Sequence, residues 1–126
     1  MVKNTLGLSK MKESSSISET FNLAYKNHTK NFFKKAEDLY KKILNIDPNH
    51  FESIFLLGTL YAQTKKFNEA LQFLSKAKDI QPNNADVHNN LGGVLKELEN
   101  YEKAISCYEK VIKINPNVVQ AYNNLG

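Results

Sequence analysis

Apolar and polar residues alternate along this chain with the period of α-helices, in segments separated by short polar joints. In the last full segment, Ala104, Tyr108 and Val111 follow one another at spacings of four and three, which places them on one helix face. Prolines interrupt the pattern because they cannot continue a helix. The pattern predicts helices over 17–29, 33–46, 51–63, 67–80, 85–97, 101–114 and 119–126.

The prolines mark a repeat, because Pro48, Pro82 and Pro116 are each 34 residues apart. Alignment on them gives full units at 17–50, 51–84 and 85–118 and a partial unit at 119–126. Within the units, the recurring residues are Leu23, Leu57, Leu91 and Leu125, then Ala24, Gly58, Gly92 and Gly126, and later Ala36, Ala70 and Ala104. A fixed period of 34 is typical of a solenoid of helical hairpins. Such solenoids present extended concave surfaces, which favours binding over catalysis.

The repeated small residues predict where the helices pack. A glycine inside a helix costs about 1 kcal/mol relative to alanine, so Gly58 and Gly92 are expected where the partner helix passes too close for a side chain. The repeated alanines are the expected contact points on that partner. Asn49 and Asn83, each directly after a proline, are expected to cap the helices that follow.

This pattern resembles the tetratricopeptide repeat. Residues 85–116 match nearly every motif position, and the second unit is close behind. The first unit departs from the motif, with Ala24 in place of glycine and Asn27 in place of a large apolar residue. The resemblance covers Ile17 to the C-terminus and implies an all-α, right-handed superhelical solenoid of antiparallel helix pairs.

Composition fits a soluble globular chain. Of 126 residues, 24% are charged and 41% hydrophobic, which is ordinary for one compact domain. Residues 1–15 are rich in Ser and Lys without a helical period and are expected to form a disordered, mobile tail. We find neither a membrane-spanning apolar run nor a signal peptide in the sequence, so we expect a cytoplasmic protein without a membrane partner.

The net charge of +4 comes partly from lysines in that tail and on one helix. The helix carries Lys34, Lys35, Lys41 and Lys42, with acidic residues spaced to pair with some of them, as in Glu37–Lys41. A nucleic-acid surface would combine arginine and exposed aromatic residues with the lysines, and this patch has no arginine. The patch is therefore interpreted as a solvated face, and no nucleic-acid partner is expected.

Residues suited to catalysis or metal binding are scattered. His28, His50 and His88 lack zinc-ligand spacing to one another or to Cys107. His88 is expected to be packed against neighbouring helices, and Cys107 to be a partly exposed thiol. The sequence therefore predicts no metal site, no cofactor and no enzymatic activity in this chain.

The family resemblance implies that the first helix of each unit lines the concave groove. The groove residues expected from it are Phe21, Asn22, Tyr25, Phe55, Leu56, Asn89, Asn90, Asn123 and Asn124. The N-terminal part of this set is apolar and aromatic, and the C-terminal part is a ladder of amides. Asparagine both donates and accepts hydrogen bonds, so it can pair with a peptide main chain of almost any sequence. A similar asparagine row lines the repeat arm of O-linked N-acetylglucosamine transferases.

Three interpretations stay open. The first is a protein-binding module that holds an extended peptide or a partner helix in its groove. The second is the substrate-recruiting arm of a larger enzyme, such as a glycosyltransferase. The third is self-association through the C-terminal end, where Tyr122 and Leu125 would lack a covering helix. Clamping of acidic chaperone tails is not expected, because the groove would carry Glu52 and Asp86 in place of lysine or arginine.

Overall fold

The computed structural model describes the backbone of residues 2–117 and the side chains of residues 13–117. Within that part the chain is entirely helical, as the sequence predicts. The helices are α1 (Val2–Thr29), α2 (Phe33–Ile46), α3 (Phe51–Gln63), α4 (Phe67–Ile80), α5 (Ala85–Glu97) and α6 (Tyr101–Ile114).

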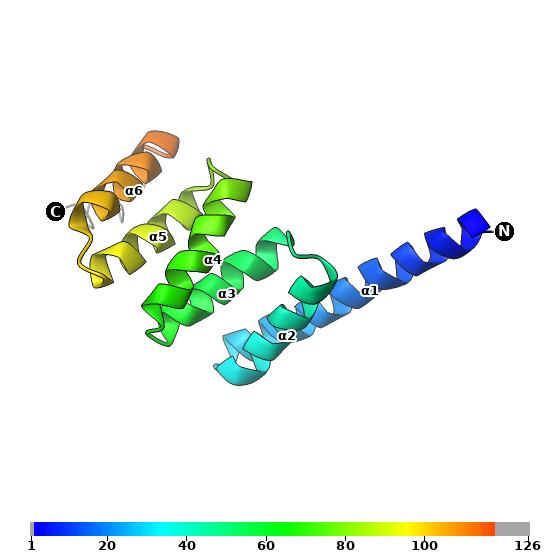
Figure 1. Cartoon of the computed structure of the whole chain (residues 1–126). Helices are drawn as coiled ribbons and strands as arrows, with labels where there is room; N and C mark the ends of the chain where they lie inside the picture. Colours follow the sequence, from blue (N-terminus) through cyan, green and yellow to red (C-terminus); the bar gives the residue numbers. More distant parts are fainter. Residues whose placement is uncertain (1, 118–126) are drawn as a thin grey trace. The chain divides into compact units, whose positions relative to one another are not determined.

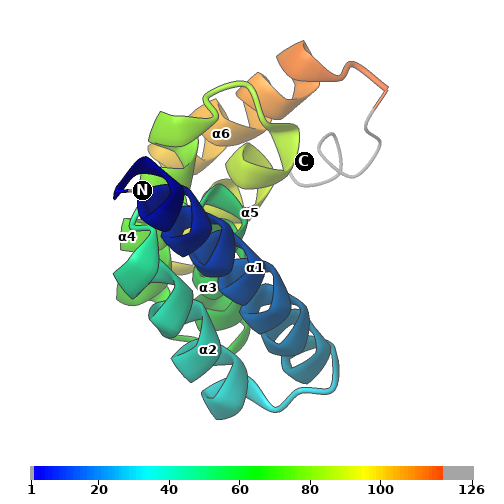
Figure 2. The same cartoon turned by 90° about the vertical axis from the view of Figure 1, so that its right-hand side faces the viewer.

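The chain divides into two compact units, Met1–Ser53 and Ile54–Gly126, which we call the N-terminal and C-terminal units. In the N-terminal unit, α1 and α2 lie side by side as a hairpin (Figures 1 and 2). In the C-terminal unit, α5 contacts both α4 and α6. The helix α3 packs on α4, where the rings of Tyr61 and Phe73 lie 5.6 Å apart.

The predicted bounds of the helices from 33–46 to 101–114 are confirmed. At the N-terminus the prediction needs correction, because α1 begins at Val2 and residues 2–15 are helical where a disordered tail was expected. No proline interrupts this stretch, and its one glycine, Gly7, costs a helix only about 1 kcal/mol. The predicted seventh helix, 119–126, lies outside the described residues.

The turn inside each described hairpin has the same backbone. Asn31, Lys65 and Glu99 occupy equivalent positions, with φ angles of 64°, 63° and 62°. At each turn this residue's N–H donates to the carbonyl three residues earlier, and the next N–H donates to the carbonyl five residues earlier. These two bonds form a Schellman motif. Its left-handed residue suits glycine or asparagine and is strained for Lys65 and Glu99.

The caps of the helices that follow the prolines lie one residue later in the chain than expected. The side chain of Asn84 caps α5 by accepting from the N–H groups of Asp86 and Val87. At the equivalent place before α3, Nδ1 of His50 accepts from the N–H of Ser53 at 3.3 Å. The expected caps at Asn49 and Asn83 are therefore wrong, because two residues and not one separate each proline from the first helical turn.

The close approach expected at the repeated glycines is confirmed, with a different partner. A Cβ atom on Gly58 would lie 2.9 Å from Cγ of Leu74, and one on Gly92 would lie 2.8 Å from Cε1 of Tyr108. The repeated alanines Ala70 and Ala104 are buried nearby in the core but are not the atoms nearest to the glycines. The side chain that leaves no room for a Cβ at each glycine is the large residue four positions after the alanine.

Candidate functional site

A hollow of about 690 Å³ opens in the C-terminal unit beside the first helices of its two hairpins. We call it the amide hollow, because Asn89 and Asn90 of α5 line it. Its other lining residues are Thr59, Ala62 and Gln63 of α3, Lys65, Phe67, Gly93, Val94, Lys96, Glu97 and Tyr108. A Cβ on Gly93 would meet nothing closer than the Tyr108 hydroxyl at 3.8 Å, so this part of the wall is open to a ligand.

Two hydrogen bonds fix the orientation of the Asn90 side chain. Its Nδ2 donates to Oγ1 of Thr59 at 3.1 Å, and that hydroxyl donates to the main-chain carbonyl of Phe55 at 2.9 Å. An amide has a second N–H and a carbonyl oxygen, which this chain of bonds does not use. The Asn90 side chain is therefore already ordered, and a further hydrogen bond to it would not have to order it first.

The structure brings together part of the expected groove. Asn89 and Asn90 share the amide hollow. Phe55 and Leu56 of the same unit are half-buried and are not among the residues that line it. The last two expected members, Asn123 and Asn124, lie outside the described residues, as do Tyr122 and Leu125 of the expected uncovered end.

Two aromatic residues of the expected groove contact each other in the N-terminal unit. Phe21 and Tyr25 stack at 6.4 Å with an angle of 17° between their planes. Tyr25 is 51% exposed, and Asn22 beside it is also exposed. The Phe21 ring further contacts the rings of Tyr40 and His50. Phe21 therefore combines a packing role with a place on the surface.

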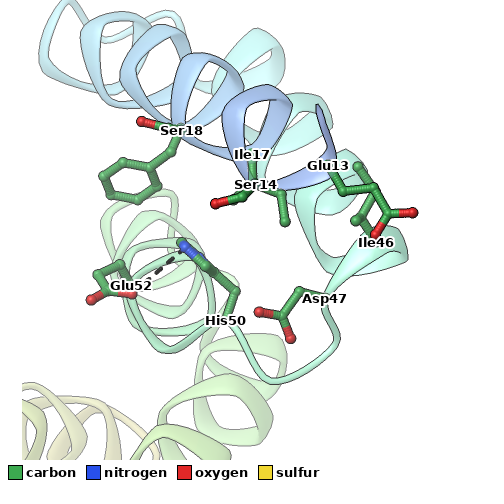
Figure 3. Close-up of a pocket in the computed structure, with 9 residues that line it drawn as sticks. Glu13, Ser14, Ile17, Ser18, Ile46, Asp47, His50 and Glu52 are labelled. Carbon is green, nitrogen blue, oxygen red and sulfur yellow. Dashed lines mark ion pairs between the residues drawn. The ribbon is translucent and has the colours of Figure 1, made fainter. Parts of the chain in front are cut away.

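A second hollow, of about 650 Å³, lies in the N-terminal unit between α1 and the loop from α2 to α3 (Figure 3). We call it the acidic hollow. It is lined by Glu13, Ser14, Ile17, Ser18, Phe21, Ile46, Asp47, His50 and Glu52. Sequence reasoning missed this site, because it assigned residues 1–15 to a tail and read the loop only as a joint. The available signal was the acidic pair Asp47 and Glu52 on either side of Pro48 and His50.

The buried side chains with acid–base chemistry are tied into the packing. Tyr40 is fully buried, which raises the pKa of its phenol far above the ordinary value, with a smaller effect from Tyr25. The phenol oxygen lies 2.9 Å from Nδ1 of His28. His88 is buried as expected, and its Nε2 donates to the carbonyl of Pro82 at 2.6 Å. These contacts assign the residues structural roles.

Cys107 differs from its expectation, because it is buried rather than partly exposed. Burial raises the pKa of its thiol, and nearby Lys78 only partly offsets this, so the reactive thiolate is disfavoured. Among the described side chains, no group of three or more His, Cys, Asp or Glu residues is arranged to hold a metal ion. None of the described helices is long and apolar enough to cross a bilayer.

Comparison with known proteins identifies the family. The sequence model of the family described as anaphase-promoting complex, cyclosome, subunit 3 matches residues 29–111. The chain belongs to this family. Its repeats are of the tetratricopeptide type, as the sequence predicts. Tetratricopeptide modules generally mediate protein interactions and are not catalytic. A search of curated proteins finds no significant match.

Solved structures confirm the all-α tetratricopeptide fold. A mutant of Thermobaculum terrenum O-GlcNAc transferase is 24% identical with a TM-score of 0.82, over 90% of this chain and 22% of the other. A MamA protein is 27% identical with a TM-score of 0.83, over 89% of this chain and 61% of the other. The first repeat domain of Spaghetti, bound to the HSP90 peptide SRMEEVD, is 23% identical with a TM-score of 0.84, over 89% of both chains. The chain thus spans about a fifth of the transferase and less than two thirds of MamA.

Proposed function

We propose that this chain is a protein-interaction module whose C-terminal unit binds an extended peptide segment in the amide hollow. The observation that carries the proposal is the pair Asn89 and Asn90 in one hollow, with Asn90 held in place by Thr59. Asparagine is a poor residue for a helix interior, yet two adjacent ones stand half-buried in α5 and line the hollow. Amides that can both donate and accept suit the main chain of a peptide.

Main-chain recognition predicts a specific profile of affinity. Because amides read the peptide bonds, replacing single peptide side chains should change the dissociation constant little. Methylating the peptide nitrogens that face the hollow should abolish binding, since each methyl group removes a donor. Charges of both signs line the hollow, from Lys65, Lys96 and Glu97. The acidic peptide SRMEEVD, which Spaghetti binds, should therefore bind no better than an uncharged peptide of the same length.

A displayed library of random heptapeptides, selected on the whole chain, supplies the probe. The selected peptides are measured by fluorescence anisotropy against Asn89→Ala and Asn90→Ala. Each variant should weaken binding by roughly 2- to 12-fold, as expected for loss of one hydrogen bond, with an unchanged circular dichroism spectrum. Asn68→Ala is the matched control, because Asn68 is exposed on α4 and does not line the hollow. Equal affinity in all three variants would reject the proposal.

The same hollow would serve a substrate-recruiting arm of a larger enzyme, such as a glycosyltransferase. Recruiting a polypeptide substrate needs the same main-chain recognition as binding a regulatory partner. The two roles differ in what happens to the peptide after binding, so they share the anisotropy test. A full-length protein that modifies the selected peptides would favour the enzymatic role.

A further inference from the structure

The acidic hollow of the N-terminal unit combines an apolar wall with carboxylates at its edge. Ile17 and Phe21 of α1 and Ile46 at the end of α2 supply the apolar surface. Figure 3 shows Glu13 and Glu52 on opposite sides of the hollow, with Asp47 and His50 between them. An amphipathic guest with a long apolar stem and a polar end matches this layout better than a purely apolar one.

The carboxylates of this hollow differ from those of α2, which pair with lysines. On α2, Glu37 lies 3.1 Å from Lys41, and Asp38 lies 3.3 Å from Lys34. Within the described part of the chain, no lysine side chain pairs with Glu13, Asp47 or Glu52, and no lysine is among the residues lining the hollow. Although the chain has a net charge of +4, the lysine side chains of residues 13–117 therefore leave the carboxylates of this hollow without an ion pair.

His50 is tied to the N-terminal turn of α3 by its own contacts. Its Nδ1 accepts the N–H of Ser53 at 3.3 Å, and the Ser53 hydroxyl lies 2.8 Å from the same atom. These two contacts hold the ring in place at the wall of the hollow. The other ring nitrogen, Nε2, lies 3.7 Å from Oε2 of Glu52.

We propose that the acidic hollow binds an arginine side chain of a partner peptide. The aliphatic stem would lie on Ile17 and Ile46, as long basic side chains do on apolar surfaces. The planar guanidinium would stack on the Phe21 ring and donate to the carboxylates, which it can pair with in a two-pronged geometry. Lysine would bind more weakly, because its compact ammonium group cannot stack on a ring and pair with carboxylates in a two-pronged geometry at the same time.

This site is separate from the peptide hollow proposed above. It lies in the other unit, and it selects a side chain, whereas the amide hollow reads a main chain. A partner could use either one alone. The two proposals therefore depend on different residues. In NMR, a peptide bound in the acidic hollow should shift backbone amides within 13–53, and one bound in the amide hollow should shift those within 54–117.

The test is a titration of the isotope-labelled chain followed by two-dimensional NMR. The probes are three acetylated and amidated heptapeptides of alanine and glycine with arginine, citrulline or glutamate in the centre. Citrulline keeps the shape of arginine and removes its charge. We expect the arginine peptide to shift the amides of Phe21, His50 and Glu52, with citrulline at least ten-fold weaker and glutamate without effect.

Variants assign the effect to the carboxylates. Glu13→Gln and Glu52→Gln should each weaken the arginine peptide by roughly three-fold, the size expected for an exposed charge pair. Glu19→Gln is the matched control, because Glu19 is an exposed residue of α1 that does not line the hollow. Equal binding of arginine and citrulline, equal affinity in all variants, or no shifts at about 10 mM peptide would each overturn the proposal.

Discussion

The side-chain amide of Asn90 donates to the hydroxyl of Thr59 across 3.1 Å, joining α5 to α3 inside the C-terminal unit. The two residues are 31 apart in sequence, so this bond depends on the fold and not on local helix geometry. Both residues line the amide hollow. The bond thus links the packing of the hairpins to the position of a side chain that we propose binds peptide.

Thr59→Val tests this link, because valine keeps the shape of threonine and lacks the hydroxyl. We expect the free energy of unfolding in urea to fall by about 0.5–1.5 kcal/mol, as for loss of one hydrogen bond. Affinity for peptides selected on the amide hollow should fall as well, since Asn90 loses its anchor. In Thr64→Val, the hydroxyl removed bonds only carbonyls of its own helix. That control should leave peptide affinity unchanged, and a loss equal to that in Thr59→Val would contradict the link.

Replacing a left-handed turn residue by glycine should stabilise the fold. Glu99 has a φ of 62°, a conformation that costs a residue with a side chain about 1–2 kcal/mol. Glu99→Gly removes this strain at the expense of greater freedom in the unfolded chain, and we expect a net gain of about 0.5–1 kcal/mol in thermal unfolding. Glu109→Gly, in the middle of α6, should have the opposite sign and lose about 1 kcal/mol. A loss in both variants would show that the Glu99 side chain stabilises the turn.

Replacing each of two adjacent glycines of α5 by alanine should change the stability of the fold in opposite directions. A Cβ on Gly92 would lie 2.8 Å from Cε1 of buried Tyr108, whereas the nearest atom to a Cβ on Gly93 is 3.8 Å away. Alanine at 93 gains helix propensity without a clash, but at 92 it must displace a packed ring. We expect Gly92→Ala to be about 1–3 kcal/mol less stable than Gly93→Ala in urea unfolding. Equal stabilities would mean that the α5–α6 pair opens readily.

The buried phenol of Tyr40 predicts a dependence of stability on alkaline pH. Because burial raises its pKa in the folded chain, the unfolded chain loses this proton first as pH rises past about 10. The unfolded state then binds fewer protons than the folded state, so stability is full below pH 10 and falls above it. Tyr40→Phe cannot ionise, and its stability should fall less steeply between pH 9 and 11. At neutral pH the same variant should lose about 1 kcal/mol, because His28 loses its hydrogen-bond partner, the Tyr40 hydroxyl.

Tyr101→Phe is the control for the pH experiment, since it removes an exposed phenol from the other unit. Chemical denaturation at a series of pH values gives the slope for each variant. An identical slope for Tyr40→Phe and the wild-type chain would contradict the assignment of the alkaline loss to Tyr40.

The sequence predicts most of the helices because prolines and the 34-residue period fix their register. The start of α1 escaped prediction because Ser14, Ser15 and Ser16 break the apolar pattern without ending the helix. The caps were misplaced by one residue, since Asn83 and Asn84 are chemically alike and only the backbone decides which one is extended. Chemistry alone does not distinguish them.

The amide hollow was partly predictable and the acidic hollow was not. Asn89 and Asn90 follow from their positions in the repeat, whereas the bond from Asn90 to Thr59 depends on how two hairpins pack. The acidic hollow joins Glu13 to Asp47 and Glu52 across the α1–α2 hairpin. Such a grouping comes from the three-dimensional path of the chain and leaves no local pattern in the sequence.

The bonds that close each hairpin turn join main-chain atoms, with an added side-chain cap from Asn100 before α6, while the proline joints use side chains such as Asn84 and His50. The two kinds of connection should therefore tolerate mutational drift differently. The exposed side chain of Glu99 takes no part in the bonds that close its turn. A dye or affinity tag attached at this position should therefore leave the hairpin intact. The joints hold the information that starts each new hairpin, and engineered arrays built from this chain should keep them intact.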